Sequence, residues 1–503
     1  MNLRRWASLF VLCVLFASVA HAHVGSPNVF FEGQAGAYPV KATIRMPAVV
    51  PGRAAIEVRV PADQAIEVSF LPLYSRIPTK NAPPPEPAHA VPGEPGCYAG
   101  ELWLMRVGAY GIEVRIHGAV GDGMVQMPVN SIATHQLPLP PSLSGILLAF
   151  GGLLTFGGIA IVYAAASESV VLPGVAVENL QRRKGMVAAA VTVVIVALAL
   201  WGGWHWWKVE EQNFRRQLRE GAWPDLAASV ETKGGDRVLH LTIGEQAFKP
   251  AEALALLPDH GKLLHAFLIR EPDHAVFAHL HPVFTGGKTF DLTLPPIPEG
   301  TYKILADLTF AYSAISTTAA GTVSIPSVPA AGLSRVAPAP DSDDSWAESS
   351  PQAAVGEQVC TLPGLRVTWK PHSPLRANHD ANLVFEVRDS TGAAVVLEPY
   401  MGMMSHAAVL RNGGAVFAHL HPSGNYSMAA QSYFESKLVR DAGGEGDGVI
   451  DHSKMHHGAM PSSDSSTISL PYEFPSPGSY RIWVQIKTGG QVETATFDTQ
   501  VLP

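Results

Sequence analysis

The chain is poor in cysteine, and it lacks the short motifs of the common enzyme classes. Of three cysteines among 503 residues, Cys13 lies in an N-terminal apolar segment, which leaves Cys97 and Cys360 in separate predicted domains. Two isolated cysteines indicate no disulfide framework. The sequence contains no GxSxG, HExxH, CxxC or glycine-rich phosphate loop. It therefore gives no support to a catalytic function, and we expect a protein that is not an enzyme.

Charged residues are also scarce, at 16% of the chain, and the net charge is -8. A chain with no basic excess is not expected to bind nucleic acid. Hydrophobic side chains make up 47% of a sequence long enough for about three domains.

Three apolar segments predict export and membrane insertion. Residues 1–22 combine Arg4 and Arg5 with an apolar run and a small-residue ending, as in a secretory signal peptide, and cleavage there leaves His23 at the N-terminus. Residues 143–166 and 186–207 are predicted transmembrane helices. The basic residues of the loop 167–185 place this loop in the cytoplasm. We expect a protein of the bacterial inner membrane, in contact with its lipids, whose larger part is periplasmic.

The remaining segments predict β-structure in three domains. Residues 23–136 alternate between apolar and polar side chains, as in AIEVRV at 55–60, and this pattern is typical of half-buried strands. Two further β-domains are expected at 225–326 and 357–503. The segment 327–356 is rich in proline, alanine and serine, and it predicts a disordered linker. A short polar helix is expected at 208–220.

The string AVFAHLHP occurs at 275–282 and again at 415–422. Two copies indicate two homologous domains that share a group of histidines. Because side chains on a strand alternate with a period of two, both imidazoles of each His-Leu-His step point to the same face. Such a pair is a candidate chelate for a transition metal, although a repeated fold can equally repeat histidines that only support its core.

The turn of the second copy determines which residues face each other. A two-residue loop at Asn412-Gly413 places His406 opposite His419 and Met404 opposite His421. A loop at Gly413-Gly414 shifts the pairing by two residues and leaves the same face intact, whereas a three-residue loop breaks the arrangement. In either two-residue form, three imidazoles and a thioether share one face of the sheet.

In the first copy, a three-residue loop at 271–273 places His265 opposite His279, with His281 on the same face. Leu263 stands where the second copy has Met404. We therefore expect the first site to be poorer in soft ligands.

The second copy has additional donors that favour copper. Met401, Met403 and Met404 precede His406, and a later segment adds further candidates, namely His452, Met455, His456, His457 and Met460. Mixed thioether and imidazole ligands suit copper. The later segment can also be a solvated polar loop. An N-terminal His23 offers its amine and imidazole as a two-point copper chelate.

The two HLHP domains also share a strand signal, since PEGTY at 298–302 matches PGSY at 477–480. The HLHP hairpins and this strand resemble the YtkA-like and FixH-like extracytoplasmic β-sandwich families of bacteria. The FixH-like resemblance implies an accessory role beside copper-handling or oxidase proteins. The N-terminal region resembles an uncharacterised bacterial membrane-protein family, and a mature chain that starts with histidine resembles the CopC-like copper carriers.

The sequence thus predicts a mostly β chain with three immunoglobulin-like β-sandwiches and a two-helix transmembrane hairpin between the first and the second. We expect a membrane-anchored protein that binds copper in its last domain for sensing, storage or delivery. The alternative is a non-catalytic scaffold of a membrane complex whose histidines are structural.

Overall fold

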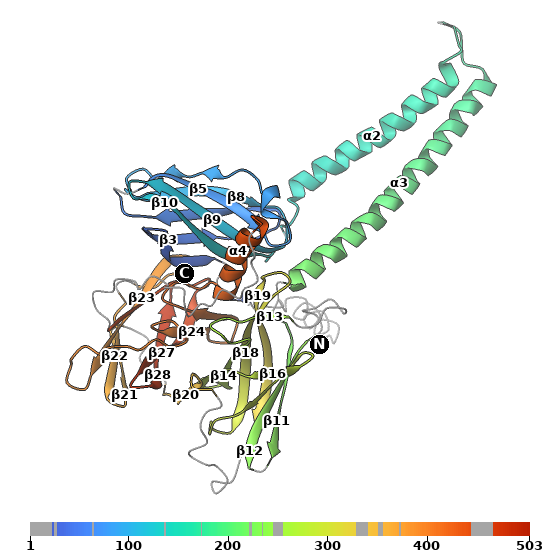
Figure 1. The fold of residues 1–503 in the computed structure, drawn as a ribbon. Helices are drawn as coiled ribbons and strands as arrows, with labels where there is room; N and C mark the ends of the chain where they lie inside the picture. The colour runs from blue at the N-terminus through green and yellow to red at the C-terminus, as the bar shows by residue number, and fades with distance from the viewer. Residues whose placement is uncertain are drawn as a thin grey trace, which may run out of the picture. The chain divides into compact units, whose positions relative to one another are not determined.

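The computed structural model describes residues 23–24, 28–62, 65–134, 137–172, 174–220, 224–233, 235–244, 255–327, 341–350, 356–371, 374–443 and 466–503. Strands dominate the chain, and they form three pairs of sheets (Figure 1). The predicted class is confirmed, with a helical hairpin between the first and second β-sandwich. The sandwiches belong to one compact unit, and residues 134–219 form a second unit.

The N-terminal domain is a sandwich of a five-stranded and a four-stranded sheet. The first sheet contains β2 (Val29–Ala35), β3 (Tyr38–Arg45), β4 (Gly52–Arg59), β8 (Cys97–Leu104) and β7 (His89–Ala90). The second contains β10 (Gly121–Ser131), β9 (Gly108–Gly118), β5 (Ala65–Tyr74) and β6 (Glu86–Pro87), with the short 3-10 helix η1 (Thr79–Asn81) after β5. The alternation at 55–60 buries Ile56 and Val58 in the shared core, as predicted.

The first HLHP domain pairs two sheets around its own core. One contains β11 (Leu226–Lys233), β12 (Asp236–Ile243), β17 (Thr289–Thr293) and β16 (Val283–Gly286). The other contains β13 (Leu256–Leu257), β18 (Gly300–Phe310), β14 (His265–Glu271), β15 (Val276–Leu280) and β20 (Ser345–Glu348), and β19 (Ser316–Ile325) also pairs with β18. The HLHP hairpin is therefore β14–β15.

The second HLHP domain repeats this plan. One sheet contains β21 (Gln358–Leu362), β22 (Leu365–Trp369), β23 (Asp380–Asp389) and β26 (Thr467–Glu473). The other contains β1 (His23–Val24), β25 (Val416–Leu420), β24 (His406–Arg411), β27 (Gly478–Thr488) and β28 (Gln491–Val501). The HLHP hairpin is β24–β25.

A helix that the sequence analysis missed follows the second HLHP. The helix α4 (Met428–Asp441) begins after Ser427, whose side chain accepts a hydrogen bond from the backbone N–H of Ala430. Its Phe434 is fully buried against Leu71 and Leu73 of the N-terminal domain. At the corresponding point of the first repeat, the chain continues into β16 and β17.

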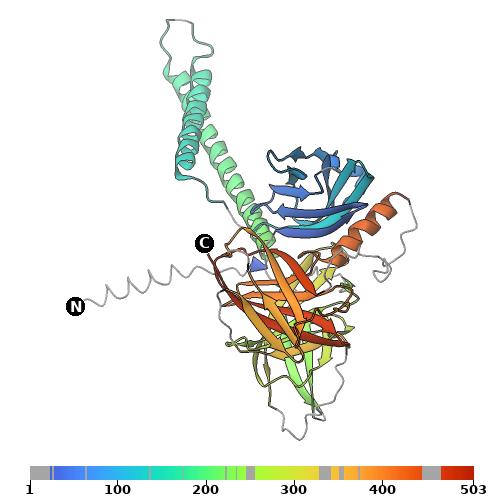
Figure 2. The same ribbon diagram turned by 90° about the vertical axis from the view of Figure 1, so that its left-hand side faces the viewer.

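The two HLHP sheets face each other, as the green-to-yellow and orange-to-red strands show in Figure 2. Phe277 of β15 stacks on Trp483 of β27 with ring centroids 4.7 Å apart. Phe267, Leu410 and Phe417 complete the apolar contact. The opposite faces of the same hairpins are buried in their own domain cores. Because the strands VFAHL are covered on both sides, their nearly continuous apolar sequence is explained.

Part of the expected disordered linker is ordered structure. Strand β20 pairs with β15 in antiparallel register, with Ser345 opposite His279. The prediction for this part of 327–356 was wrong, because the segment forms β-ladder hydrogen bonds and side-chain contacts that composition does not reveal.

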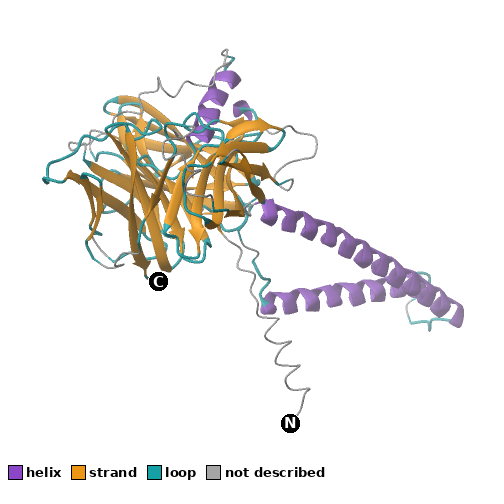
Figure 3. Cartoon of the chain, turned by 90° about the horizontal axis from the view of Figure 1, so that it is seen from below, coloured by secondary structure: helices purple, strands orange, loops and turns teal. Residues whose placement is uncertain are grey.

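The second unit contains two long helices, α2 (Pro141–Glu168) and α3 (Asn179–Glu220), drawn in purple in Figure 3. Both are long and apolar enough to cross a membrane. The polar segment 208–220 is a continuation of α3 rather than a separate helix. Gly185 of α3 lies against Ser167 and Tyr163 of α2, where an added Cβ would come within about 3 Å of both side chains.

Candidate metal centre

The hairpin registers differ from the predicted pairing by two residues in both repeats. In the second repeat Ala408 is opposite His419, so that His406 is opposite His421. The last ladder pair is Leu410 with Phe417, and the loop after it contains Gly413 and Gly414 with φ values of 87° and 71°. This register matches the alternative centred on Gly413-Gly414, which keeps His406, His419 and His421 on one face. In the first repeat Phe267 is opposite His279, so that His265 is opposite His281.

Seven histidines gather where the two HLHP sheets meet, and we call them the histidine cluster. They are His260, His265, His279, His281, His406, His419 and His421. Two groups within the cluster each bring three ligand atoms within 4.8 Å of one another. The first group is His265, His279 and His281, and the second is His260, His406 and His421. The second group spans both repeats, since His260 comes from the first repeat.

The two repeats build closely similar contacts around their histidines. His265 Nδ1 lies 3.1 Å from His279 Nε2, and His406 Nδ1 lies 3.1 Å from His419 Nε2. His265 Nε2 donates to the carbonyl of Asp259 at 3.1 Å, and His406 Nε2 donates to the carbonyl of Tyr400 at 3.0 Å. The hairpins therefore hold their imidazoles in defined orientations.

Each repeat also supplies a polar side chain to the middle histidine of the other. His279 Nδ1 lies 2.8 Å from Gln485 Oε1 of β27. His419 Nδ1 lies 3.4 Å from Asp307 Oδ2 of β18. The centre is consequently a joint product of the two domains, and neither hairpin alone completes it.

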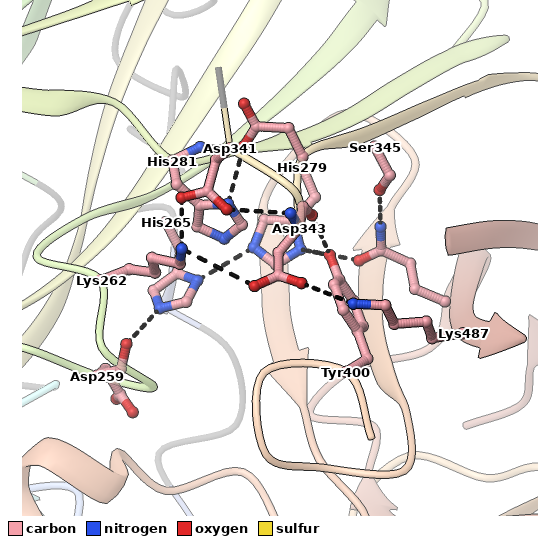
Figure 4. Close-up of polar contacts among 12 residues, drawn as sticks. Asp259, Lys262, His265, His279, His281, Asp341, Asp343, Ser345, Tyr400 and Lys487 are labelled. Atoms are coloured by element: carbon pink, nitrogen blue, oxygen red, sulfur yellow. Dashed lines mark hydrogen bonds and ion pairs between the residues drawn. The ribbon is translucent and has the colours of Figure 1, made fainter. Parts of the chain in front are cut away.

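The strand β20 pairs with β15 beside the first group, and Figure 4 shows Asp341 and Asp343 near His279 and His281. Asp344 Oδ1 lies 2.8 Å from His281 Nδ1, and both side chains are almost fully buried. A carboxylate behind a ring nitrogen is the usual device that orients a metal-ligating histidine. Asp341 and Asp343 contact Lys262, and Asp343 also pairs with Lys487 of the second repeat (Figure 4).

Burial keeps these histidines in the form that binds metals. Desolvation, together with the neighbouring His419, lowers the pKa of His265 to about 4. Desolvation also lowers the pKa values of His279, His281, His406 and His421 well below the usual value. Neutral imidazole has a free lone pair, so these five rings need not lose a proton to bind a metal near pH 7.

Several buried nitrogens of the cluster lack a hydrogen-bond partner among the described residues. These atoms are Nδ1 and Nε2 of His421 and Nε2 of His281. Buried polar atoms are normally paired, because an unmade hydrogen bond costs about 1–3 kcal/mol. A metal ion bound to His281 Nε2, and another bound to one ring nitrogen of His421, would give these atoms a partner. The donor set thus fits a transition metal with imidazole ligands.

The remaining predicted ligands divide into three cases. The predicted place of Met404 on the ligand face is wrong. Met404 is 40% exposed, and the residue opposite His421 is His406 rather than Met404. The register shift moved the pairing, and the residues before β24 turn away from the strand direction. The backbone of His23 pairs with Val416 of β25. The predictions for His452, Met455, His456, His457 and Met460 lie outside the described residues.

Sequence reasoning missed His260 and the residues that support the cluster. His260 precedes the first HLHP strand in the segment DHGKLLH, which aligns with YMGMMSH in the second repeat. Its only sequence signal is its place in this aligned segment, a few residues before His265. Asp344 and Gln485 had no recognisable signal, because they lie far from the histidines along the chain. Cys97 and Cys360 are both buried and unpaired.

Comparison with known proteins gives a family model that matches part of the chain and solved structures with weak similarity. Residues 360–502 match the model of a domain of unknown function, DUF8832. No curated protein matches the chain. Among solved structures, the BSP domain of a biofilm-associated protein is 9% identical with a TM-score of 0.13, covering 98% of this chain and 69% of that one. The bacterial integrin-binding protein invasin is 9% identical with a TM-score of 0.14, covering 92% and 60%.

Proposed function

We propose that this chain is a membrane-anchored, extracytoplasmic protein that binds copper between its two HLHP domains for sensing, storage or delivery. The observation that carries the proposal is the pair of buried three-histidine groups, whose ligand atoms lie within 4.8 Å of one another. Imidazole ligands suit copper, and also zinc, iron and nickel. Copper is favoured by the buried methionine Met401, which precedes His406 in the sequence.

The burial of the site supports metal retention or delivery to a partner that opens it. His265, His279, His281, His406 and His421 are each at most 4% exposed. A closed site limits exchange with solvent, as storage and delivery proteins require. Copper-handling or oxidase proteins at the membrane are the partners that this reading implies, and they also fit the FixH-like resemblance.

The placement in the membrane rests on the two apolar helices and on the basic residues at the start of the second helix. Arg182, Arg183 and Lys184 belong to the first turns of α3, and positive charge favours the cytoplasmic side. Both β-regions then lie on the outer side of the inner membrane.

The second candidate is a scaffold in which the histidines only support the fold. It is favoured by the hydrogen bonds that His265 and His406 donate to backbone carbonyls. Under this reading the cluster is a polar layer between two sheets, and no metal is needed.

Metal titration of the full chain in detergent separates the two candidates. The metal-free protein should bind Cu(II) with one ion for each histidine group, measured by calorimetry and elemental analysis. A double variant, His281→Leu with His421→Leu, removes one ligand from each group and should abolish tight binding. The matched control is His240→Leu with His379→Leu, which changes two histidines outside the cluster and should bind as the unmodified chain does.

Retention of copper by the double variant, or no binding by the folded unmodified chain, would reject the metal proposal. Parallel titrations with Zn²⁺ determine whether copper is the preferred metal. The scaffold reading forecasts no metal-dependent rise in melting temperature for any of the three proteins.

A further inference from the structure

The two halves of the histidine cluster are related by an approximate two-fold symmetry. The rings of His265 and His281 are 5.1 Å apart at 85°, and those of His406 and His421 are 4.8 Å apart at 88°. The rings of His279 and His281 are 4.8 Å apart at 53°, and those of His419 and His421 are 4.5 Å apart at 62°. The three histidines of each hairpin are therefore equivalent by position to those of the other.

The symmetry extends to the turns that precede β14 and β24, the first strands of the two HLHP hairpins. Asp259 forms a bridge with Lys262, and Tyr400 forms the same bridge with Met403. The second residue of each turn has a left-handed backbone, with φ of 50° at His260 and 48° at Met401. The glycines that follow have φ values of 79° and 78°. Met401 is thus the structural equivalent of His260.

His260 reaches across to the group of the other repeat. Its ring lies 5.1 Å from that of His406 and 4.8 Å from that of His421. By the same symmetry, we expect the side chain of Met401 to point towards His265 and His281. Met401 is 8% exposed, in contrast to 40% for Met404. Tyr400, the residue before Met401, contacts both groups: its ring lies 4.9 Å from that of His406, and its hydroxyl lies 3.4 Å from His279 Nδ1 (Figure 4).

We infer that Met401 is the soft ligand of the first group, so that the cluster contains two chemically different metal sites. One site combines His265, His279 and His281 with the Met401 thioether. The other is the all-imidazole group of His260, His406 and His421. Thioether sulfur favours Cu(I), whereas an imidazole set also accepts Cu(II) and Zn²⁺. This inference rests on the proposed metal function and adds a difference in preference between the sites.

The assignment reverses the expectation from the sequence. There the soft donors were expected at the second site, because Met404 directly precedes its strand. Exchange of the two turns across the domain interface gives the methionine of the second repeat to the first group and the histidine of the first repeat to the second group.

The test compares Met401→Leu with Met404→Leu in the full chain. Met401→Leu should weaken Cu(I) binding roughly tenfold or more in an anaerobic chelator competition, a loss comparable to that caused by changes around a metal ligand. Zn²⁺ binding at the all-imidazole site should be unchanged. Met404→Leu, which alters an exposed methionine three residues away, should bind both ions as the unmodified chain does.

X-ray absorption of the Cu(I)-loaded chain gives a second readout. A copper–sulfur contribution should be present in the unmodified chain and in a variant with Met404, Met455 and Met460 all changed to leucine. It should disappear in Met401→Leu. The triple variant keeps the test decisive if Met401→Leu does not fold, since loss of the sulfur signal there overturns the assignment.

The outcomes distinguish this inference from the proposed function. If the unmodified chain binds copper but Met401→Leu retains both its Cu(I) affinity and its sulfur signal, the role of Met401 is wrong and the metal centre stands. If the folded unmodified chain binds no copper, both fall.

Discussion

The unusual feature of individual residues in this protein is the number of neutral histidines buried between two sheets. Lysine, arginine and acidic side chains are rarely buried without partners, and imidazole can be buried because its neutral form costs less to desolvate. His421 is the extreme case, since both of its ring nitrogens lack hydrogen-bond partners among the described residues.

We predict that His421→Leu leaves the metal-free protein as stable as the unmodified chain, or more stable. The change replaces two unpaired buried nitrogens by apolar carbon of similar size, so a desolvation penalty disappears and no hydrogen bond is lost. His279→Leu is the matched change, and it removes the contacts with Gln485 and His265. It should cost about 1–3 kcal/mol. Chemical denaturation of the metal-free variants measures both, and a large loss for His421→Leu would reveal an unrecognised partner.

The contact between Phe277 and Trp483 gives a second residue-scale prediction. Both rings are fully buried and stacked at the centre of the interface between the repeats. Trp483→Ala should lower the free energy of unfolding by about 3–5 kcal/mol. Thermal melting measures the loss. Trp103→Ala is the control, because that side chain is 58% exposed, and equal losses for the two variants would contradict the interface.

Among the secondary-structure elements, the HLHP hairpins show how a turn controls a site. A shift of the loop by one residue changes the cross-strand pairing by two and keeps the face, because side chains alternate with a period of two. The histidines that share one face of each hairpin were therefore predictable from the sequence, whereas the residues opposite them on the neighbouring strand were not.

The helix α4 carries a carboxyl group that should make stability depend on pH. Desolvation raises the pKa of Glu435 from 4.5 to about 7. Between these values the folded chain holds more protons than the unfolded chain, so stability falls as pH rises through this window. The contribution is at most about 3 kcal/mol, since one pKa unit corresponds to about 1.4 kcal/mol.

Glu435→Gln should remove this part of the pH dependence. The gain in its free energy of unfolding over that of the unmodified chain should therefore be larger at pH 7.5 than at pH 5. Denaturant unfolding at both pH values measures the effect. Glu386→Gln is a control on the surface of β23, where the side chain is 46% exposed. An identical pH profile for Glu435→Gln and the unmodified chain would show that burial does not govern this carboxyl group.

At the scale of the whole molecule, the basic residues Arg182, Arg183 and Lys184 at the start of α3 predict an orientation of the chain in the membrane. We predict that only about 167–185 is cytoplasmic and that both ends of the mature chain are outside. Alkaline phosphatase fused near Glu178 should therefore be inactive, and a fusion after Pro503 should be active. Comparable activity at the two positions would overturn the topology.

The second HLHP domain should fold alone but should not remain monomeric. Residues 356–503 have their own core, yet Ala408, Leu410, Phe417 and Trp483 pack on the first repeat. Isolation exposes this apolar face, which favours self-association. Circular dichroism should show strands with a cooperative melt, and ultracentrifugation should show dimers or larger species. A disordered spectrum would contradict the autonomy of the domain.

The sequence by itself determined the fold class, the repeated hairpins, the apolar helices and six of the seven clustered histidines. These features depend on local periodicity and on spacing within a repeat, which the chain records directly. The ordered strand β20 and the helix α4 escaped prediction, because a proline- and serine-rich composition and a weakly amphipathic segment carry weak local signals.

Only the tertiary structure decided that the two histidine sets form one centre. Packing of the two HLHP sheets brings His260 to His406 and Gln485 to His279, and these pairs are separated by well over a hundred residues of sequence. The tertiary structure also leaves Met404 exposed, outside the histidine cluster, and buries Met401. The physical reason is that domain pairing is set by complementary apolar faces, which local sequence patterns do not specify.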